Sequence, residues 1–69
     1  MNHRELTRKL RALGCEFQRH AKGDHEIWVR LVPRARTTIP NWGGRDLKPG
    51  TISRILRDRK ISKGDFESA

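Results

Sequence analysis

The stretch Cys15–Pro40, CEFQRHAKGDHEIWVRLVPRARTTIP, decides the fold because its apolar residues recur at every second position. Turn-forming segments at 22–24 and 33–35 interrupt this pattern. They divide the stretch into runs at 15–21, 25–32 and 36–39. Short runs with a period of two are typical of β-strands. We therefore predict three consecutive strands joined by two short loops.

The pairing of these strands can be tested against the sequence, because a slip of one residue turns a strand's apolar side chains to the other face. Three-residue loops at both turns pair Ala21 with His25, Arg19 with Ile27, Phe17 with Val29, Cys15 with Leu31, Leu31 with Thr37, and Val29 with Ile39. This register predicts an antiparallel meander with one apolar inner face. The outer face, left to solvent or a partner, would carry Glu16, Gln18, His20, Glu26, Trp28 and Arg30.

A helix is predicted before the strands, at 3–13. Asn2 can cap its start, and Gly14 suits the left-handed residue that often follows a helix. Its apolar stripe consists of Leu6, Leu10 and Leu13. The spacing of these leucines places them on one side of a helix, which would pack on the sheet.

A second helix is predicted at 52–60, with Thr51 as its N-cap and an apolar face of Ile52, Ile55 and Leu56. The expected fold is α+β, in the order α-β-β-β-α, with both helices on one face of a three-stranded antiparallel sheet. We expect one domain over 1–62. The polar residues 63–69 are expected to form a flexible C-terminal tail.

Composition points to a polyanionic partner. The chain has 69 residues, and 16 Lys plus Arg against 8 Asp plus Glu give a net charge of +8. Its basic residues are mostly arginines, which suit bidentate contact with phosphate. No apolar run is long enough to span a membrane, and the charged first residues do not resemble a secretory signal. The single cysteine allows no internal disulfide, so a cytoplasmic location is expected.

Most familiar catalytic motifs are absent, and no metal or cofactor is expected. Cys15 falls on the predicted inner face, where it is interpreted as a small core residue. The three histidines lack zinc-ligand spacing. His3 and His20 are interpreted as ordinary surface residues. His25 differs, since it opens a predicted strand at the rim of the core, directly after a lysine and a flexible glycine, and imidazole transfers protons near neutral pH.

Several segments together resemble one protein family in order and spacing. They are Asn2–Leu6 (NHREL), Leu13–Cys15 (LGC), Lys22–Trp28 (KGDHEIW), Ile39–Pro40 (IP), Leu47–Ile52 (LKPGTI) and Ile55–Leu56 (IL). This pattern is similar to that of the HicA (YcfA-like) mRNA interferase toxins. The resemblance implies a fold like the double-stranded RNA-binding domain and metal-independent cleavage of mRNA by one histidine. It also implies neutralisation by a HicB-type antitoxin.

By position, the resemblance makes His25 the catalytic residue and places Gly23 and Asp24 in the turn that positions it. The family commonly has Ser or Asp at the position of Asp24, which fits. Two departures remain. Trp42 stands where many relatives have a histidine, and Lys60 stands where a glycine is common, near the end of the second helix.

Candidate RNA-binding residues are Arg4, Arg8, Lys22, Lys48 and Arg54. Trp28 and Trp42 are further candidates, for stacking on unpaired bases. Two other functions stay open from the residues alone: a non-catalytic RNA-binding module of the same fold, and a protein that binds mainly an acidic partner. For the toxin, we expect a monomer when free and a hetero-oligomer with the antitoxin.

Overall fold

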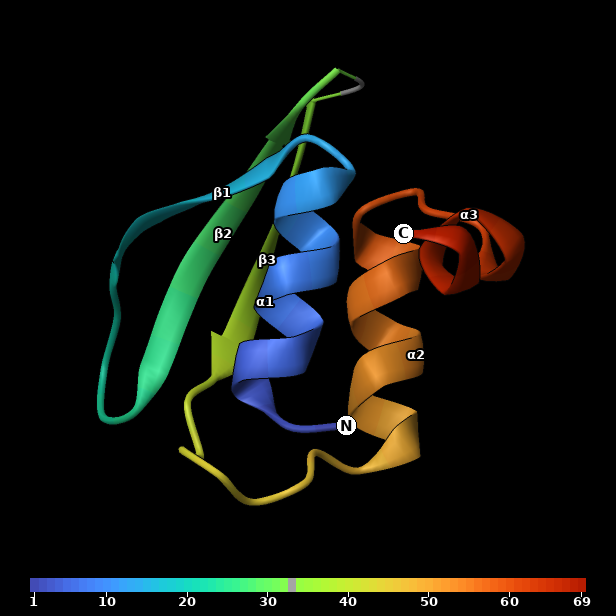
Figure 1. The fold of residues 1–69 in the computed structure, drawn as a ribbon. Helices are drawn as coiled ribbons and strands as arrows, with labels where there is room; N and C mark the ends of the chain where they lie inside the picture. The colour runs from blue at the N-terminus through green and yellow to red at the C-terminus, as the bar shows by residue number, and fades with distance from the viewer. Residues whose placement is uncertain (33) are drawn as a thin grey trace.

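The computed structural model describes residues 1–32 and 34–69 and confirms the predicted order of elements. The helices and strands are α1 (His3–Ala12), β1 (Cys15–His20), β2 (His25–Leu31), β3 (Arg34–Pro40), α2 (Pro49–Asp58) and α3 (Lys63–Ser68). The strands form one antiparallel sheet in the order β1-β2-β3. Helices α1 and α2 lie side by side on one face of this sheet, which confirms the α+β architecture (Figure 1).

The first helix forms as its sequence predicts. The Asn2 side chain accepts a hydrogen bond from the backbone N–H of Glu5, at 3.0 Å, and so caps the helix start. Leu6 and Leu10 are fully buried against the sheet. Gly14 follows with a φ of 88°, in the left-handed region that favours glycine. The structure of α1 therefore agrees with the amphipathic pattern of its sequence and with the predicted signals at both of its ends.

The predicted register holds only near the first turn. Arg19 lies opposite Ile27, and the backbone N–H of Ala21 donates to the carbonyl of His25, as expected. A bulge between Phe17 and Arg19 then shifts the pairing. Beyond it, Phe17 lies opposite Trp28 and Cys15 opposite Arg30, so these two predicted pairs are wrong.

The predicted pairing of the second and third strands is also wrong. Strand β3 begins at Arg34, which lies directly opposite Leu31, whereas the prediction paired Leu31 with Thr37. This is a shift of three residues, so Ile39 now lies opposite Glu26. Pro33, which belonged to the predicted loop, lies outside the described residues. Because the shift is odd, it changes which face of β2 accompanies the buried side chains of β3.

The inner face of β2 is consequently the opposite of the predicted one, whereas Cys15 of β1 and Ile39 of β3 are buried as predicted. Trp28 is 1% exposed and Glu26 is 6% exposed, although both were assigned to the outer face. Val29 and Leu31 point outward instead. Burial of one tryptophan removes more apolar area from water than burial of a valine. Trp28 points to the same side of the sheet as Cys15 of β1 and Ile39 of β3, which are also buried.

The second helix starts earlier than predicted, at Pro49, with Lys48 in place of Thr51 as its N-cap. Proline suits this first position, because its φ is already helical and the missing N–H would have no helical acceptor. The apolar face agrees with the prediction: Ile55 and Leu56 are buried and Ile52 packs against the core.

The segment 63–69, predicted to be a flexible tail, contains the short helix α3 in the structure. The Ser62 side chain caps it by accepting from the N–H of Asp65, at 3.1 Å. Phe66 is 6% exposed and belongs to the core, and Lys9 of α1 donates to its carbonyl, at 3.3 Å. One aromatic side chain thus attaches the end of the chain to the domain.

The core lies between the sheet and its helices. Its members are Leu6, Leu10, Cys15, Trp28, Ile39, Leu47, Ile55, Leu56, Ile61 and Phe66. In the part of the chain that the structure describes, none of the helices has the length and apolar character needed to cross a membrane.

Candidate functional site

The candidate site lies at one end of the sheet, where three segments distant in sequence meet. The turn at 21–24, the loop at 41–48 and the start of α1 all lie at this end (Figure 1). The backbone N–H of Asn41 donates to the carbonyl of Asp24, at 2.8 Å, and that of Leu47 donates to the carbonyl of Met1, at 2.8 Å. These bonds join the loop to both neighbouring segments and give the turn a defined backbone.

His25 is held at the tip of this turn by the backbone and stays open to solvent. Gly23 has a φ of 67°, which closes the turn, and the N–H of His25 donates to the carbonyl of Lys22, at 3.3 Å. The imidazole Nδ1 lies 3.1 Å from the same carbonyl and 3.8 Å from Asp24 Oδ1. The side chain is 51% exposed. No hydrogen bond from the described residues reaches Nε2.

The strand explains why His25 is exposed while its neighbour is buried. Side chains alternate along β2, so His25 shares the outer face with Ile27, and Glu26 turns inward with Trp28. Within the inner face, Glu26 accepts three hydrogen bonds. His3 Nε2 and Trp28 Nε1 donate to Oε1, at 2.6 and 3.0 Å, and Asn41 Nδ2 donates to Oε2, at 3.1 Å.

These contacts keep Glu26 ionised inside the domain. Burial by itself would raise the pKa of this carboxyl. Hydrogen bonds from Trp28, His3 and Asn41, together with positive charge on His3, outweigh burial and lower its pKa below the usual value of 4.5. The carboxylate therefore links α1, β2 and the 41–48 loop directly behind His25. Because Asn41 also holds the carbonyl of Asp24, this cluster positions the turn.

The predicted RNA-binding residues fall into two groups. Arg4, Lys22 and Lys48 are exposed and belong to the three segments at the His25 end, and Arg8 is exposed one turn further along α1. Arg54 lies apart from them on α2. Its guanidinium donates to Asp58 Oδ2 at 3.1 Å, to Thr37 Oγ1 at 3.3 Å and to the carbonyl of Thr38 at 2.9 Å. Arg54 thus ties α2 to β3.

The structure is inconsistent with Trp28 as a platform for bases. Its ring is buried, its Nε1 is bonded to Glu26, and the guanidinium of Arg11 lies 5.0 Å from its ring centre. Trp42 is half-buried against the core, and the guanidinium of Arg45 lies 5.0 Å from its ring centre. His20, predicted on the outer face, lies opposite Glu26, and its exposed ring makes an edge contact with Phe17.

A second charged residue, Arg59, is buried in the core away from the His25 turn. Arg59 is fully buried, and its guanidinium donates to the carbonyls of Ala35 and Thr37 in β3. Burial lowers the pKa of Arg59 to about 10. Burial also raises the pKa of the neighbouring Cys15 thiol, which the charges of Arg59 and Arg30 only partly oppose. A protonated, buried thiol confirms the interpretation of Cys15 as a core residue.

Sequence reasoning missed Glu26 and Arg59 because charged side chains are rarely buried, and it missed Asn41, an exposed residue, because its bond to Glu26 forms only in the folded chain. The partners lie in other elements: Asn41 follows β3, and the Arg59 guanidinium bonds to carbonyls of β3. No local pattern marks these residues. Within the described part of the chain, no group of three His, Cys, Asp or Glu side chains is arranged to hold a metal ion.

Comparison with known proteins gives one match. The profile of a family described as "HicA toxin of bacterial toxin-antitoxin" matches residues 3–61 of the 69-residue chain. No curated protein and no solved structure matches. The matched range includes α1, all three strands and α2, and it contains His25 with its turn.

Proposed function

Because this chain belongs to the family of HicA toxins of bacterial toxin-antitoxin systems, we propose that it is an endoribonuclease that cleaves mRNA through His25. A HicB-type antitoxin neutralises it. The free toxin is a monomer in the cytoplasm, and it forms a hetero-oligomer with the antitoxin.

The placement of the His25 imidazole carries this proposal. Both groups near Nδ1, the carbonyl of Lys22 and the carboxylate of Asp24, accept hydrogen bonds. The neutral ring therefore carries its proton on Nδ1 and directs the lone pair of Nε2 to solvent. A lone pair held in this way is what a general base needs, because the backbone fixes the tautomer before the substrate arrives.

In the proposed reaction, Nε2 removes the proton from a ribose 2′-OH. The 2′-oxygen then forms a bond to the adjacent phosphorus while the bond from phosphorus to the 5′-oxygen breaks. The products are a 2′,3′-cyclic phosphate and a 5′-OH, and the 5′-oxygen gains its proton from the imidazolium or from water. Attack by a neighbouring hydroxyl requires no metal ion.

The surrounding cations support a phosphate at this site. Lys22 is in the turn itself, and Arg4 and Lys48 are in the two segments joined to it. Lys48 precedes α2, whose first turn has no side-chain cap, so backbone N–H groups of this turn remain available to an anion. Arg8 extends this surface along α1. RNA contact by Arg54 stays a prediction, and it would require Arg54 to share its present hydrogen bonds with a phosphate.

The test compares wild type with His25→Ala, and uses His20→Ala as the matched control. His20 is an exposed histidine in the same hairpin. Each purified protein is incubated with single-stranded RNA in EDTA, and the products are examined for a 2′,3′-cyclic phosphate. We expect wild type and His20→Ala to cleave the RNA and His25→Ala not to cleave it. None of the three proteins should cleave a strand of the same sequence in which every ribose is replaced by 2′-deoxyribose.

Other outcomes would contradict the proposal in distinct ways. Equal cleavage by wild type and His25→Ala would remove His25 from the reaction. Salt-dependent RNA binding without cleavage by wild type would favour the alternative of a non-catalytic RNA-binding module. Absence of RNA binding at low salt would exclude both functions.

A further inference from the structure

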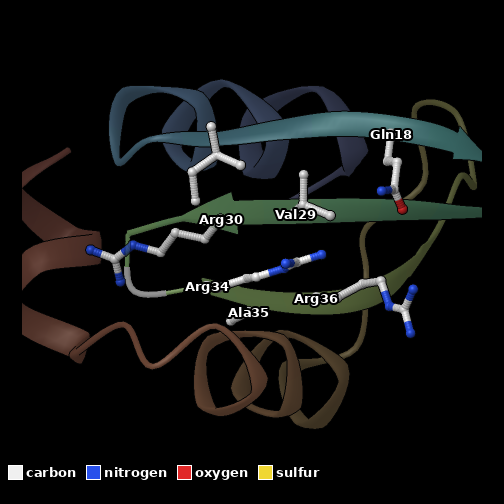
Figure 2. A pocket seen from close by; sticks show the side chains of 7 residues that line it. Gln18, Val29, Arg30, Arg34, Ala35 and Arg36 are labelled. Atoms are coloured by element: carbon white, nitrogen blue, oxygen red, sulfur yellow. The ribbon is translucent and has the colours of Figure 1, made fainter.

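The outer face of the sheet carries exposed aliphatic side chains that the domain itself does not cover. Leu31, the last residue of β2, is 63% exposed, and Val29 on the same face is half-buried; Val32, directly after the strand, is 84% exposed. Figure 2 looks onto this face and shows Val29, Arg34 and Arg36 on the side of the sheet away from α1 and α2. Aliphatic side chains gathered on a surface often mark an interaction site.

Arginines accompany these aliphatic residues in a regular arrangement. In the β2–β3 register, Val29 lies opposite Arg36 and Leu31 lies opposite Arg34. Side chains of directly opposed residues on one face are neighbours. Together with Gln18, Arg30 and Ala35, these four residues line an open groove of about 580 Å³. Arg34 and Arg36 form no ion pair with any described residue.

We propose that this groove, hereafter the outer groove, binds an extended acidic segment of the protein antitoxin that alternates carboxylate and aliphatic side chains. In an extended segment, side chains point alternately to two sides, and those on one side are about 6.6 Å apart. Val29 and Leu31 on β2, and Arg34 and Arg36 on β3, have this same spacing of two residues, so one side of the segment can meet each pair. Its aliphatic side chains pack on Val29 and Leu31. Its carboxylates pair with Arg34 and Arg36, away from Glu16, which lies opposite Val29 on β1.

The chemistry of the groove favours a protein over RNA. Bases of single-stranded RNA bind by stacking on aromatic rings, but none of the described residues that line the outer groove is aromatic. Trp28 lies in the core on the opposite face, and Trp42 belongs to the loop after β3. Aliphatic side chains of a partner would gain from burial against Val29 and Leu31, whereas phosphates would gain only from the arginines.

The outer groove is separate from the catalytic histidine. Val29 is four residues from His25, about 13 Å along the strand. Variants of Leu31, Arg34 or Arg36 therefore leave the His25 turn intact. The inference rests on the part of the proposed function that gives this toxin a protein antitoxin. Binding is measured with the His25→Ala protein, so the result does not depend on RNA cleavage.

The probe is a short synthetic peptide that alternates Glu and Val. It is added to the full ¹⁵N-labelled chain that carries His25→Ala, and the amide signals of the protein are followed by NMR. We expect it to shift the amide signals of β2 and β3 around Val29 and Arg36. Arg36→Glu should weaken binding about tenfold, the effect of losing one favourable charge contact and gaining a repulsive one. The matched control is Arg57→Glu, which makes the same change in charge at an exposed position on α2. Leu31→Ser should weaken binding severalfold.

Three results would overturn the proposal. A peptide that alternates Glu and Ser could bind equally well, which would show that the carboxylates alone determine binding and that the aliphatic contacts contribute nothing. Arg36→Glu and Arg57→Glu could weaken binding equally, which would show that only net charge matters. Polyuridylate could shift the same outer-face signals and displace the peptide, which would make the groove a nucleic-acid site. Failure of the RNA cleavage test with normal peptide binding would affect only the proposed function.

Discussion

His3 Nε2 lies 2.6 Å from Glu26 Oε1, and this contact joins the first turn of α1 to the strand that carries His25, the proposed catalytic residue. The two residues are 23 positions apart in sequence. Glu26 also holds Asn41, whose backbone holds the turn before His25. A buried carboxylate with three donors thus connects the packing of the helix to the position of the proposed active site.

Glu26→Gln should destabilise the domain by about 1–3 kcal/mol, because it weakens the hydrogen bonds from His3, Trp28 and Asn41 and places an amide N–H₂ near these donors. Urea unfolding followed by tryptophan fluorescence measures the effect. Glu16→Gln is the matched control, since Glu16 is exposed on β1 and its side chain makes no hydrogen bond to the described residues. Equal stability of the two variants would show that the cluster around Glu26 contributes nothing.

The stability of the domain should depend on pH through Glu26. Its pKa in the folded state is below the unfolded value of 4.5, so the folded state binds this proton less readily. The contribution of Glu26 is therefore fully present above pH 4.5, and it is lost as pH falls through the folded pKa. The difference in unfolding free energy between wild type and Glu26→Gln should shrink over this range. A difference that is constant down to low pH would contradict the assignment.

Lys60→Gly should stabilise the domain by about 0.5–1 kcal/mol. Lys60 has a φ of 57°, in the left-handed region just after α2, where a side chain is unfavourable and glycine is not. The melting temperature measures the gain. Lys60→Ala is the control, because it removes the same charge but keeps a Cβ, and it should give no comparable increase.

Arg59→Lys should destabilise the domain by about 1–3 kcal/mol. The guanidinium donates to two carbonyls of β3 at once, and a single ammonium group cannot reproduce this forked geometry. Arg57→Lys provides the comparison at an exposed position on the same helix and should be neutral. Both are assessed by urea unfolding. A neutral result for Arg59→Lys would mean that water or another group satisfies the carbonyls.

Phe66→Ala should cost about 3 kcal/mol and release α3 from the domain, because the ring is buried and its loss leaves a cavity. Hydrogen exchange of the amides of α3 and thermal unfolding measure the two effects. Glu67→Ala, at the exposed neighbouring position, should change neither. Rapid exchange throughout α3 in the wild type would support the sequence-based prediction of a flexible tail instead.

The parts of the fold that were predicted correctly depend on local signals. Asn2 caps α1, Leu6 and Leu10 mark its buried side, and Gly14 follows its end. His25 was identified by its position after Gly23 and by resemblance to the family. For α1 and for the turn before His25, the informative residues lie within a few positions of one another, and the family resemblance rests on short segments in a fixed order and spacing, so both can be recognised without the fold.

The errors arose where two faces of a strand both looked acceptable. On β2, the aliphatic residues Ile27, Val29 and Leu31 suggested an inner face, but Trp28 on the other face is the residue that is buried. A bulge in β1 and a shift of three residues in the pairing of β2 with β3 changed the register, and neither leaves a clear mark in the sequence. The unexpected inner face also left Val29 and Leu31 on the outer groove.

The sequence by itself determined the types and order of the main helices and strands, the family, and the candidate histidine at a glycine turn. The tertiary structure decided which face of β2 is buried, that Phe66 attaches the last residues to the core, and that Glu26 is an ionised link behind His25. The physical reason is that a charged residue is stable inside a protein only when distant segments supply its hydrogen bonds. For Glu26 those donors come from His3 and Asn41 as well as from its own strand, and only the folded chain brings them together.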